Sequence, residues 1–385
     1  MGTSIGAGIL ALPIATASLG FVGSLGLLLV TWFVMTMGAL LILEANLWLN
    51  ERSHLISMAG ATIGVVGQLV AWVAYLLLLY TLLCAYIAGG ADLFHHLLAT
   101  LGGVAIPDTA ATLSFVLVLG AIVYCGIHVV DYANRLLMFV KLGAYVVLVT
   151  LLTPLISTQA LFFSHFDHHM DFMTAIFVTI GSFGFATLIP SLRIYFSGDV
   201  NKLKKVIIIG SLLPLLCYVI WDIVIMGVLS FTGEYGLLNL SHSAHATSDL
   251  VYALDHTVHY ASFVFIVKLF TSICMVTSFL GVALCLADFL ADGLQMEKVG
   301  WHKLFIHVVT FAPPVLIVLF FPDIFIRAFA YAGVVSVVLL VLLPAWMVWS
   351  GRYRRHLAKG YRVFGGKGLL SSLIALSFVL ILYFI

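Results

Sequence analysis

Two glycine-rich segments have the composition of main chain that contacts a small ligand rather than of regular helix. The first runs from Gly2 through Gly6 and Gly8 to Pro13, and the second runs from Gly181 through Gly184 to Pro190. Each glycine weakens a helix by about 1 kcal/mol relative to alanine. A helix N-terminus offers N–H groups to a carboxylate, and freed carbonyls accept hydrogen bonds from an ammonium group. The segments therefore predict a site for a zwitterion such as a free amino acid, although close helix packing also uses glycine.

Aromatic and hydroxyl side chains within these segments are the first candidates for the walls of the site. A pocket of this kind combines apolar surface with a few polar groups, and Phe183 is the leading aromatic wall. The predicted substrate-binding residues from the two segments are Thr3, Ser4, Gly6, Ala7, Gly8, Gly181, Ser182, Phe183, Gly184 and Phe185.

Three ionisable residues lie deep inside apolar stretches and need a reason to be there. A charge at the centre of a membrane helix costs about 2.5–3.5 kcal/mol. Lys141 follows Arg135 by six positions, while Asp222 and Lys268 lie at similar distances from one predicted loop. We expect Lys141 to be a buried, proton-exchanging cation, or alternatively to extend towards the membrane surface. Asp222 and Lys268 are expected to form an ion pair that is either structural or part of a proton route.

The composition defines the elements that must position these residues. Of the 385 residues, 63% are hydrophobic and 9% are charged, against about 25% charged residues in soluble domains. A soluble or nucleic-acid-binding protein is thereby excluded. Because a span needs about 20 apolar residues, we predict an all-α integral membrane protein with eleven transmembrane helices. They lie near 3–20, 22–48, 67–98, 110–128, 134–156, 172–192, 205–231, 258–290, 303–321, 324–349 and 368–385.

Lysine and arginine are distributed unequally between the predicted loops. Those near 99–109, 157–171 and 232–257 have neither residue, whereas the alternate loops carry Arg52, Arg135, Arg193 and the five basic residues between Arg352 and Arg362 among others. Because basic loops face the cytoplasm, we expect the N-terminus to be cytoplasmic and the C-terminus external. The spacing of the two glycine segments, five predicted spans apart, is typical of inverted repeats in transporters.

Several other chemistries have no support in the sequence. The five cysteines are isolated in apolar runs, and no phosphate-binding glycine loop with the required spacing exists. An intramembrane hydrolase would need a Ser/His or paired-Asp arrangement at membrane depth, and none is evident. Histidines in the predicted loops at 157–171 and 232–257 are expected to be solvated and pH-responsive rather than to bind metal. We therefore predict no enzyme, metal, cofactor, nucleic acid or obligate protein partner; the expected partners are substrate, proton and lipid bilayer.

Four motifs in order resemble the hydroxy and aromatic amino acid permeases of the amino acid–polyamine–organocation superfamily. They are Gly2–Pro13, Ser182–Pro190, Thr277–Leu284 and Phe329–Gly333, and the similarity extends over essentially the whole chain. The resemblance implies a leucine-transporter-like fold with two inverted five-helix repeats, 1–156 and 172–349, and an eleventh helix, 368–385, in one transmembrane domain.

The resemblance also implies a function and further site residues. It implies proton-coupled import of an aromatic amino acid across a bacterial inner membrane, with tyrosine first, tryptophan as the alternative and phenylalanine open. Tyr80 would be a further pocket wall, since the third helix faces the first and sixth in this fold. Lys141 would replace a sodium ion beside Thr277 and Ser278, although sodium coupling stays open. Ala186 and Thr187 replace His and Gly of some relatives, which leaves the substrate choice open.

The start of the chain departs from the family pattern. Relatives carry a further stretch before the position of Gly2, which forms the first half of their first helix. The position of Met1 therefore indicates either a shortened start or a missing half-helix. The second case keeps open a sensor of amino acids that has the same fold without transport.

Overall fold

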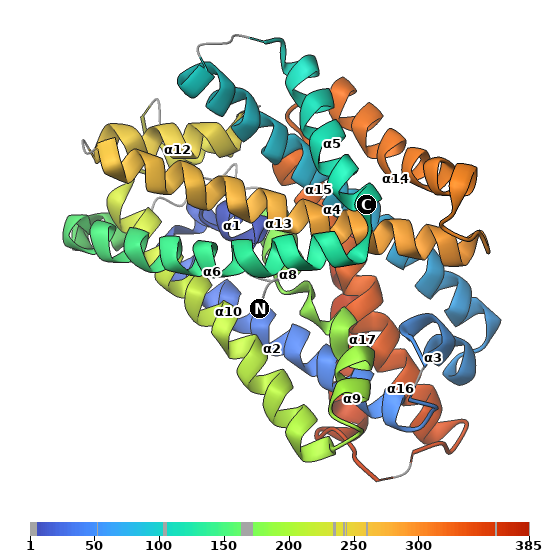
Figure 1. Cartoon of the computed structure of the whole chain (residues 1–385). Helices are drawn as coiled ribbons and strands as arrows, with labels where there is room; N and C mark the ends of the chain where they lie inside the picture. Colours follow the sequence, from blue (N-terminus) through green and yellow to red (C-terminus); the bar gives the residue numbers. More distant parts are fainter. Residues whose placement is uncertain are drawn as a thin grey trace.

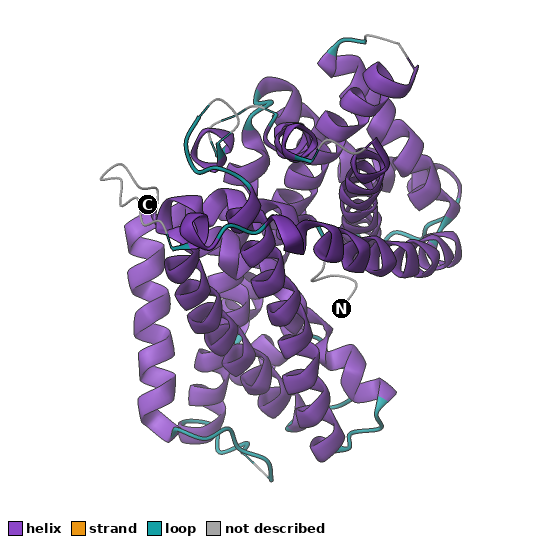
Figure 2. Cartoon of the chain, turned by 90° about the vertical axis from the view of Figure 1, so that its left-hand side faces the viewer, coloured by secondary structure: helices purple, strands orange, loops and turns teal. Residues whose placement is uncertain are grey.

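The computed structural model describes residues 6–51, 53–102, 106–162, 172–233, 236–241, 243, 245–258, 261–358 and 360–384. Over these ranges the chain consists of helices and short connections without strands, as Figure 2 shows. Helices are the expected solution for a chain of this composition, because a helix satisfies its own backbone hydrogen bonds inside a bilayer.

Ten stretches of the described chain are long and apolar enough to cross a membrane. Each overlaps a predicted span, and the ends differ from the prediction by up to seven residues, the largest difference being the start at Ile127 of the span predicted near 134–156. The long helices are α2 (Gly20–Leu47), α4 (Val65–Gly102), α5 (Asp108–Cys125), α6 (Ile127–Leu152), α10 (Val200–Val228), α13 (Ala261–Gly293), α14 (Gly300–Phe320) and α17 (Gly366–Phe384).

The first of the ten stretches, 7–47, contains a sharp turn. It consists of α1 (Ala7–Thr16), the 3₁₀ helix η1 (Ala17–Leu19) and α2, with Gly20 at φ +64°. Ser24 Oγ lies 2.9 Å from Thr16 Oγ1, whereas eight residues of continuous helix span about 12 Å. The chain therefore turns sharply between α1 and α2.

Two further stretches depart from regular α-helix. The sixth predicted span is divided into α8 (Phe172–Ser182), η3 (Gly184–Leu188) and α9 (Ile189–Tyr195). The span at 324–349 is α15 (Ile324–Val337), a π-helical turn η4 (Val338–Leu342) and α16 (Leu343–Tyr353). The connections contain short helices that were not predicted from the sequence: α3 (Leu55–Thr62), η2 (Thr153–Leu155), α7 (Thr158–Leu161), α11 (Leu237–Leu240) and α12 (Ala246–Thr257).

Helix α1 lies in the middle of the bundle, with α8, α10 and α13 around it (Figure 1). Helix α15 packs most extensively on α4 and α8. Glycine permits one of these close approaches: a Cβ at Gly333 would lie 1.9 Å from the main-chain oxygen of Phe177. Small residues at helix interfaces are a general means of bringing membrane helices together.

Buried charged side chains stabilise the end of the bundle at which Arg193 and Arg352 lie, called the basic end below. Glu44 of α2 accepts hydrogen bonds from Arg352 of α16 at 2.7 and 2.5 Å and from the backbone N–H of Val363 at 2.7 Å. Arg193 of α9 donates to the main-chain oxygen of Asn46 at the end of α2. The expected loop positions of Arg135, Arg193 and Arg352 are wrong: these residues lie within α6, α9 and α16, because those helices extend beyond their apolar runs.

Candidate functional site

The sixth span is interrupted at the predicted glycines. Helix α8 ends at Ser182, and Phe183 has φ −98° and ψ 28°, outside the helical range. The Ser182 carbonyl accepts a hydrogen bond from the Tyr218 hydroxyl of α10 at 2.9 Å. A side chain thus satisfies one main-chain group that the interruption frees, and the predicted break is confirmed.

The N-terminus of α1 lies against two other helices. The N–H of Ala7 donates to Ser278 Oγ of α13 at 3.0 Å. A Cβ at Gly6 would lie 2.2 Å from Ser278 Oγ, and one at Gly8 would lie 2.8 Å from Ser182 Oγ. These glycines therefore allow α1 to contact α13 and the end of α8. The positive end of the α1 dipole consequently lies inside the bundle, while Thr3 and Ser4 are outside the described residues.

Lys141 is fully buried, at 0% exposure, so extension to the membrane surface does not occur. Its Nζ donates to Thr277 Oγ1 of α13 at 3.1 Å. The adjacent Ser278 is the acceptor of the Ala7 N–H. The structure therefore brings Lys141, Thr277, Ser278 and the start of α1 together, as the resemblance implied.

The two phenylalanines at the break, Phe183 and Phe185, differ in burial. Phe183 is 0% exposed and packs edge-on against Tyr218, with ring centroids 5.3 Å apart. Phe185 is half-buried on η3, beside Gly184, where a Cβ would meet nothing within 4 Å. A Cβ at Gly181 would lie 3.2 Å from the main-chain oxygen of Phe329 on α15.

Tyr80 does not join this group. Its hydroxyl donates to the Val309 carbonyl of α14 at 2.8 Å. Tyr86 of the same helix is instead buried, with its ring 6.1 Å from that of Phe329. Phe329 is the residue that lies against Gly181. Since six residues correspond to about 600° of helical rotation, the two tyrosines face different directions. No signal in the sequence indicates which of these two directions faces the interrupted span.

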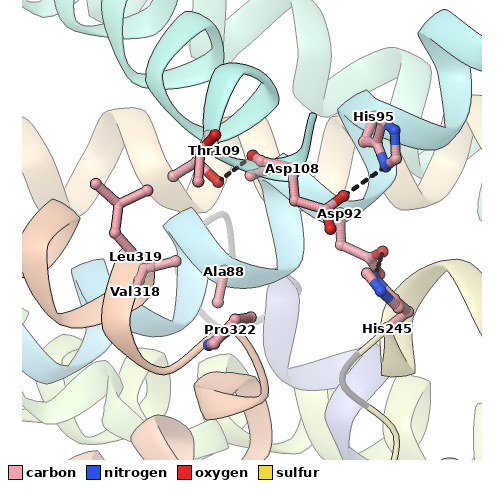
Figure 3. Close-up of a pocket in the computed structure, with 11 residues that line it drawn as sticks. Ala88, Asp92, His95, Asp108, Thr109, His245, Val318, Leu319 and Pro322 are labelled. Atoms are coloured by element: carbon pink, nitrogen blue, oxygen red, sulfur yellow. Dashed lines mark hydrogen bonds and ion pairs between the residues drawn. The ribbon is translucent and has the colours of Figure 1, made fainter. Parts of the chain in front are cut away.

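Two cavities lie at opposite ends of α4. The larger, of 400 Å³, is bordered by Trp72 and Tyr75 of α4 and by Asp288 of α13, and it reaches Thr187 of η3. Its lining also includes Pro190 and Ser191, so it borders the interrupted span. The smaller, of 60 Å³, includes Asp92 and the neighbouring His245 (Figure 3).

The predicted ion pair between Asp222 and Lys268 does not form. Asp222 Oδ2 lies 2.5 Å from Ser24 Oγ of α2, and Asp222 Oδ1 is buried with no hydrogen-bond partner. Equal depth below a loop was not sufficient to place the two side chains together, because depth does not fix the direction in which a helical side chain points.

The described histidines do not form a metal site. His245 Nδ1 lies 3.0 Å from Asp92 Oδ1, and His95 pairs with Asp108 at 2.9 Å (Figure 3). The hydrogen bond that His245 donates to the Asp92 carboxylate raises the pKa of His245 to about 9. No group of three potential metal ligands occurs among the described residues, and His165, His168, His169, His242 and His259 lie outside them.

An all-helical bundle whose central helix begins beside the interruption of another helix has the architecture of a secondary membrane transporter. The structure is similar to that of Mhp1, a nucleobase-cation-symport-1 family transporter with the leucine-transporter fold. The TM-score is 0.56 at 14% identity, over 100% of this chain and 90% of that one. The chain therefore has this fold.

Comparison of sequences gives the family. The tryptophan/tyrosine permease family matches residues 1–384. Tyrosine-specific transport system 1 of Haemophilus influenzae is 34% identical over 95% of this chain and 89% of its own length. The tryptophan-specific transport protein of that species is 31% identical over 97% of this chain and 90% of its own length. Glutamine transporter 2 of Aliivibrio fischeri is 32% identical over 90% of this chain and 86% of its own length. The chain belongs to the tryptophan/tyrosine permease family; it is a transport protein and not an enzyme.

Proposed function

We propose that the protein imports aromatic amino acids by proton-coupled symport, with tyrosine as its first substrate. The observation that carries the proposal is the contact between the N-terminus of α1 and the interruption of the sixth span, since Gly8 lies directly against Ser182. The relatives named for tyrosine and tryptophan support the aromatic substrate class.

In this proposal main-chain groups bind the charged ends of the amino acid. The N–H groups at Gly6 and Gly8 bind the carboxylate, assisted by the helix dipole, while the Ala7 N–H stays on Ser278. Carbonyls between Gly181 and Gly184 bind the ammonium group. Thr3 and Ser4, from the same glycine-rich segment, are further substrate-binding residues in this proposal.

Aromatic surface near the break receives the side chain of the substrate. Phe183 and Phe185 belong to the interrupted segment, and Gly184 leaves open space beside them. Tyr86, buried against Phe329, is a better wall on α4 than Tyr80, whose hydroxyl is bound to α14. A pocket of aromatic surface with a few fixed polar groups favours an aromatic amino acid over a smaller polar one.

Lys141 supplies the coupling cation. Its ammonium group lies on Thr277, next to the Ser278 hydroxyl that holds Ala7. Loss of a proton from Lys141 would remove the charge from this junction and weaken the attachment of α1 to α13. Exchange of that proton thereby links the position of α1 to the proton gradient.

The orientation and repeat organisation belong to the same proposal. Counting α1 and α2 separately gives eleven segments, in repeats 1–156 and 172–349 with 368–385 as the eleventh helix. The basic end faces the cytoplasm of a bacterial inner membrane, with the C-terminus external. The 400 Å³ cavity that reaches Thr187 then lies at the cytoplasmic end of the bundle.

Transport by the full chain in proteoliposomes tests the proposal. Uptake of labelled tyrosine, tryptophan, phenylalanine and glutamine is measured with and without an imposed pH gradient, against protein-free vesicles. We expect gradient-driven accumulation of tyrosine above the other three. Glutamine is included because glutamine transporter 2 is a relative; accumulation of glutamine alone would overturn the aromatic assignment, and accumulation of none would favour a sensor.

Two variants test the coupling. Lys141→Gln is expected to abolish accumulation driven by the pH gradient. Lys205→Gln is the matched control, because Lys205 is an exposed lysine of α10. Gradient-driven accumulation of wild-type size in Lys141→Gln would contradict the role of Lys141.

A further inference from the structure

Asp222 lies at a buried junction of three helices that the proposed coupling through Lys141 does not use. Asp222 of α10 is 1% exposed, and Ser24 of α2 and Thr16 of α1 are 0% exposed. Three oxygen contacts connect them: Asp222 Oδ2 to Ser24 Oγ at 2.5 Å, Ser24 Oγ to Thr16 Oγ1 at 2.9 Å, and Thr16 Oγ1 to the Leu12 carbonyl at 2.9 Å.

The number of available protons determines the state of Asp222. Each contact requires one donated proton, and each hydroxyl group has one to donate. The proton of Thr16 goes to the carbonyl of Leu12, which can only accept. The single proton of Ser24 can then be donated either to Thr16 or to Asp222. With an ionised Asp222, one of the three contacts has no proton; with a carboxylic acid, all three are hydrogen bonds.

Burial supports the same state. The second oxygen, Oδ1, has no hydrogen-bond partner. An ionised carboxylate in the membrane interior would be costly with an oxygen left unsatisfied, whereas the neutral acid has no charge to stabilise.

The elements packed on α10 provide no countercharge. Helices α1 and α7 and the turn η2 carry no ionisable side chain, and Glu44, the only ionisable residue of α2, is paired with Arg352. Helix α13, whose Phe270 packs on Trp221, carries Lys268, which is not paired with Asp222.

Helix α6 provides none either. Its Lys141 donates to Thr277, and its Tyr145 donates to the Cys217 carbonyl of α10. The remaining ionisable residues of α6 are exposed near its beginning: His128, Asp131, Tyr132 and Arg135.

We propose that Asp222 is a second proton-binding site of this protein. In this conformation its carboxyl group is protonated and donates to Ser24, which donates to Thr16, which donates to Leu12. Because Thr16 is the last residue of α1, movement of α1 would remove the end of this chain of hydrogen bonds. The resulting coupling between Asp222 and α1 rests on the proposed function; the bound proton does not.

Infrared spectroscopy of the full chain in lipid vesicles tests the proposal directly. A protonated aspartic acid at neutral pH gives a carboxylic acid C=O stretching band, which isotopic labelling of aspartate assigns to this residue type. We expect this band in the wild type, its loss in Asp222→Asn, and a shift in Ser24→Ala. Absence of a protonated aspartate band from the labelled wild type would overturn the proposal, even if Asp222→Asn failed to fold.

A matched control comes from the same helix pair. Ser211 of α10 accepts a hydrogen bond from Trp32 of α2 at 3.0 Å, about 16 Å along the helix from Asp222. Ser211→Ala should leave the band unchanged. An equal shift in Ser211→Ala and Ser24→Ala would contradict the specific contact of Ser24 with Asp222.

Transport measurements separate this proposal from the proposed function. In Asp222→Asn we expect exchange of labelled for unlabelled tyrosine to continue, while the response of uptake to pH changes. An unchanged pH response would show that the proton on Asp222 takes no part in coupling. Absence of tyrosine exchange in the wild type would refute the proposed function and leave the infrared result unaffected.

Discussion

Substitution of Gly8 by alanine probes the contact between α1 and the interrupted span. The new Cβ would lie 2.8 Å from Ser182 Oγ and 3.1 Å from Ser182 Cβ, whereas nonbonded atoms attract at about 3.5–4.0 Å. The helices must separate by roughly 0.5–1 Å, or Ser182 must rotate and lose its 2.9 Å hydrogen bond to Val178. Such overpacking costs about 1–3 kcal/mol.

Thermal unfolding in detergent and uptake in proteoliposomes measure the effect. A cost of about 1–3 kcal/mol corresponds to roughly 5- to 150-fold in the population of the closely packed arrangement. We therefore expect a lower unfolding midpoint and a large loss of uptake in Gly8→Ala. Gly210→Ala is the control, because nothing lies within 4 Å of a Cβ at that position of α10.

A second substitution distinguishes this contact from a general effect on α1. Ser182→Gly removes the two nearest atoms that the new methyl group meets and leaves only the Cα of residue 182, at 3.4 Å. The double variant Gly8→Ala/Ser182→Gly should be less destabilised than the sum of the two single variants by at least about 1 kcal/mol. Additive effects, or a Gly8→Ala variant as stable and active as the wild type, would refute the reasoning.

Three further predictions follow from other contacts. Gly333→Ala should destabilise the protein by at least about 3 kcal/mol, seen as a lower unfolding midpoint, because the Cβ would lie 1.9 Å from the main-chain oxygen of Phe177; a midpoint equal to that of the wild type would contradict the packing. Glu44→Gln leaves the buried guanidinium of Arg352 without its carboxylate and should cost about 3–5 kcal/mol in the same measurement, so an unchanged midpoint would show that the pair contributes nothing. The pKa of His245, raised to about 9 by its hydrogen bond to Asp92, lies above the ordinary value of about 6.5. The stabilising contribution of protonated His245 is therefore complete below about pH 6.5 and is lost as pH rises through 9. Hydrogen exchange of the backbone amides of α12 should accelerate over that range. Equal pH dependence of this exchange in His245→Gln would exclude His245 as the cause.

The exposed pair of Asp131 and Arg135 is the control for the buried one. These residues lie four apart on α6 with their charged atoms 2.7 Å apart, largely exposed to solvent. Pairs of this kind contribute about 0–1 kcal/mol. Asp131→Asn should therefore change the unfolding midpoint far less than Glu44→Gln.

Features set by local composition could be predicted from the sequence. Hydrophobicity located the spans, and clustered glycines located the interruption at Ser182–Gly184, because both effects act within a few residues of the chain. The burial of Lys141 beside Thr277 required more: it came from the resemblance to a known family. The residues alone left extension to the membrane surface open.

Features that depend on the rotation of one helix against another could not be predicted. Tyr80 and Tyr86 both lie in an apolar helix, and only the packing of α4 shows that the second faces Phe329. Asp222 was expected to pair with Lys268, but it contacts Ser24, 198 residues away in sequence. An apolar helix with little polar contrast between its faces gives no preferred direction, so such contacts follow from tertiary packing.

A structure determined with tyrosine bound tests the central claim most directly. We predict that the amino acid lies beside the start of α1 and the end of α8, with its carboxylate at the N–H groups of Gly6 and Gly8 and its ammonium group at the carbonyls of Gly181–Gly184. Tyrosine bound elsewhere, with α1 still packed on Ser182 and no ligand at these main-chain groups, would contradict it.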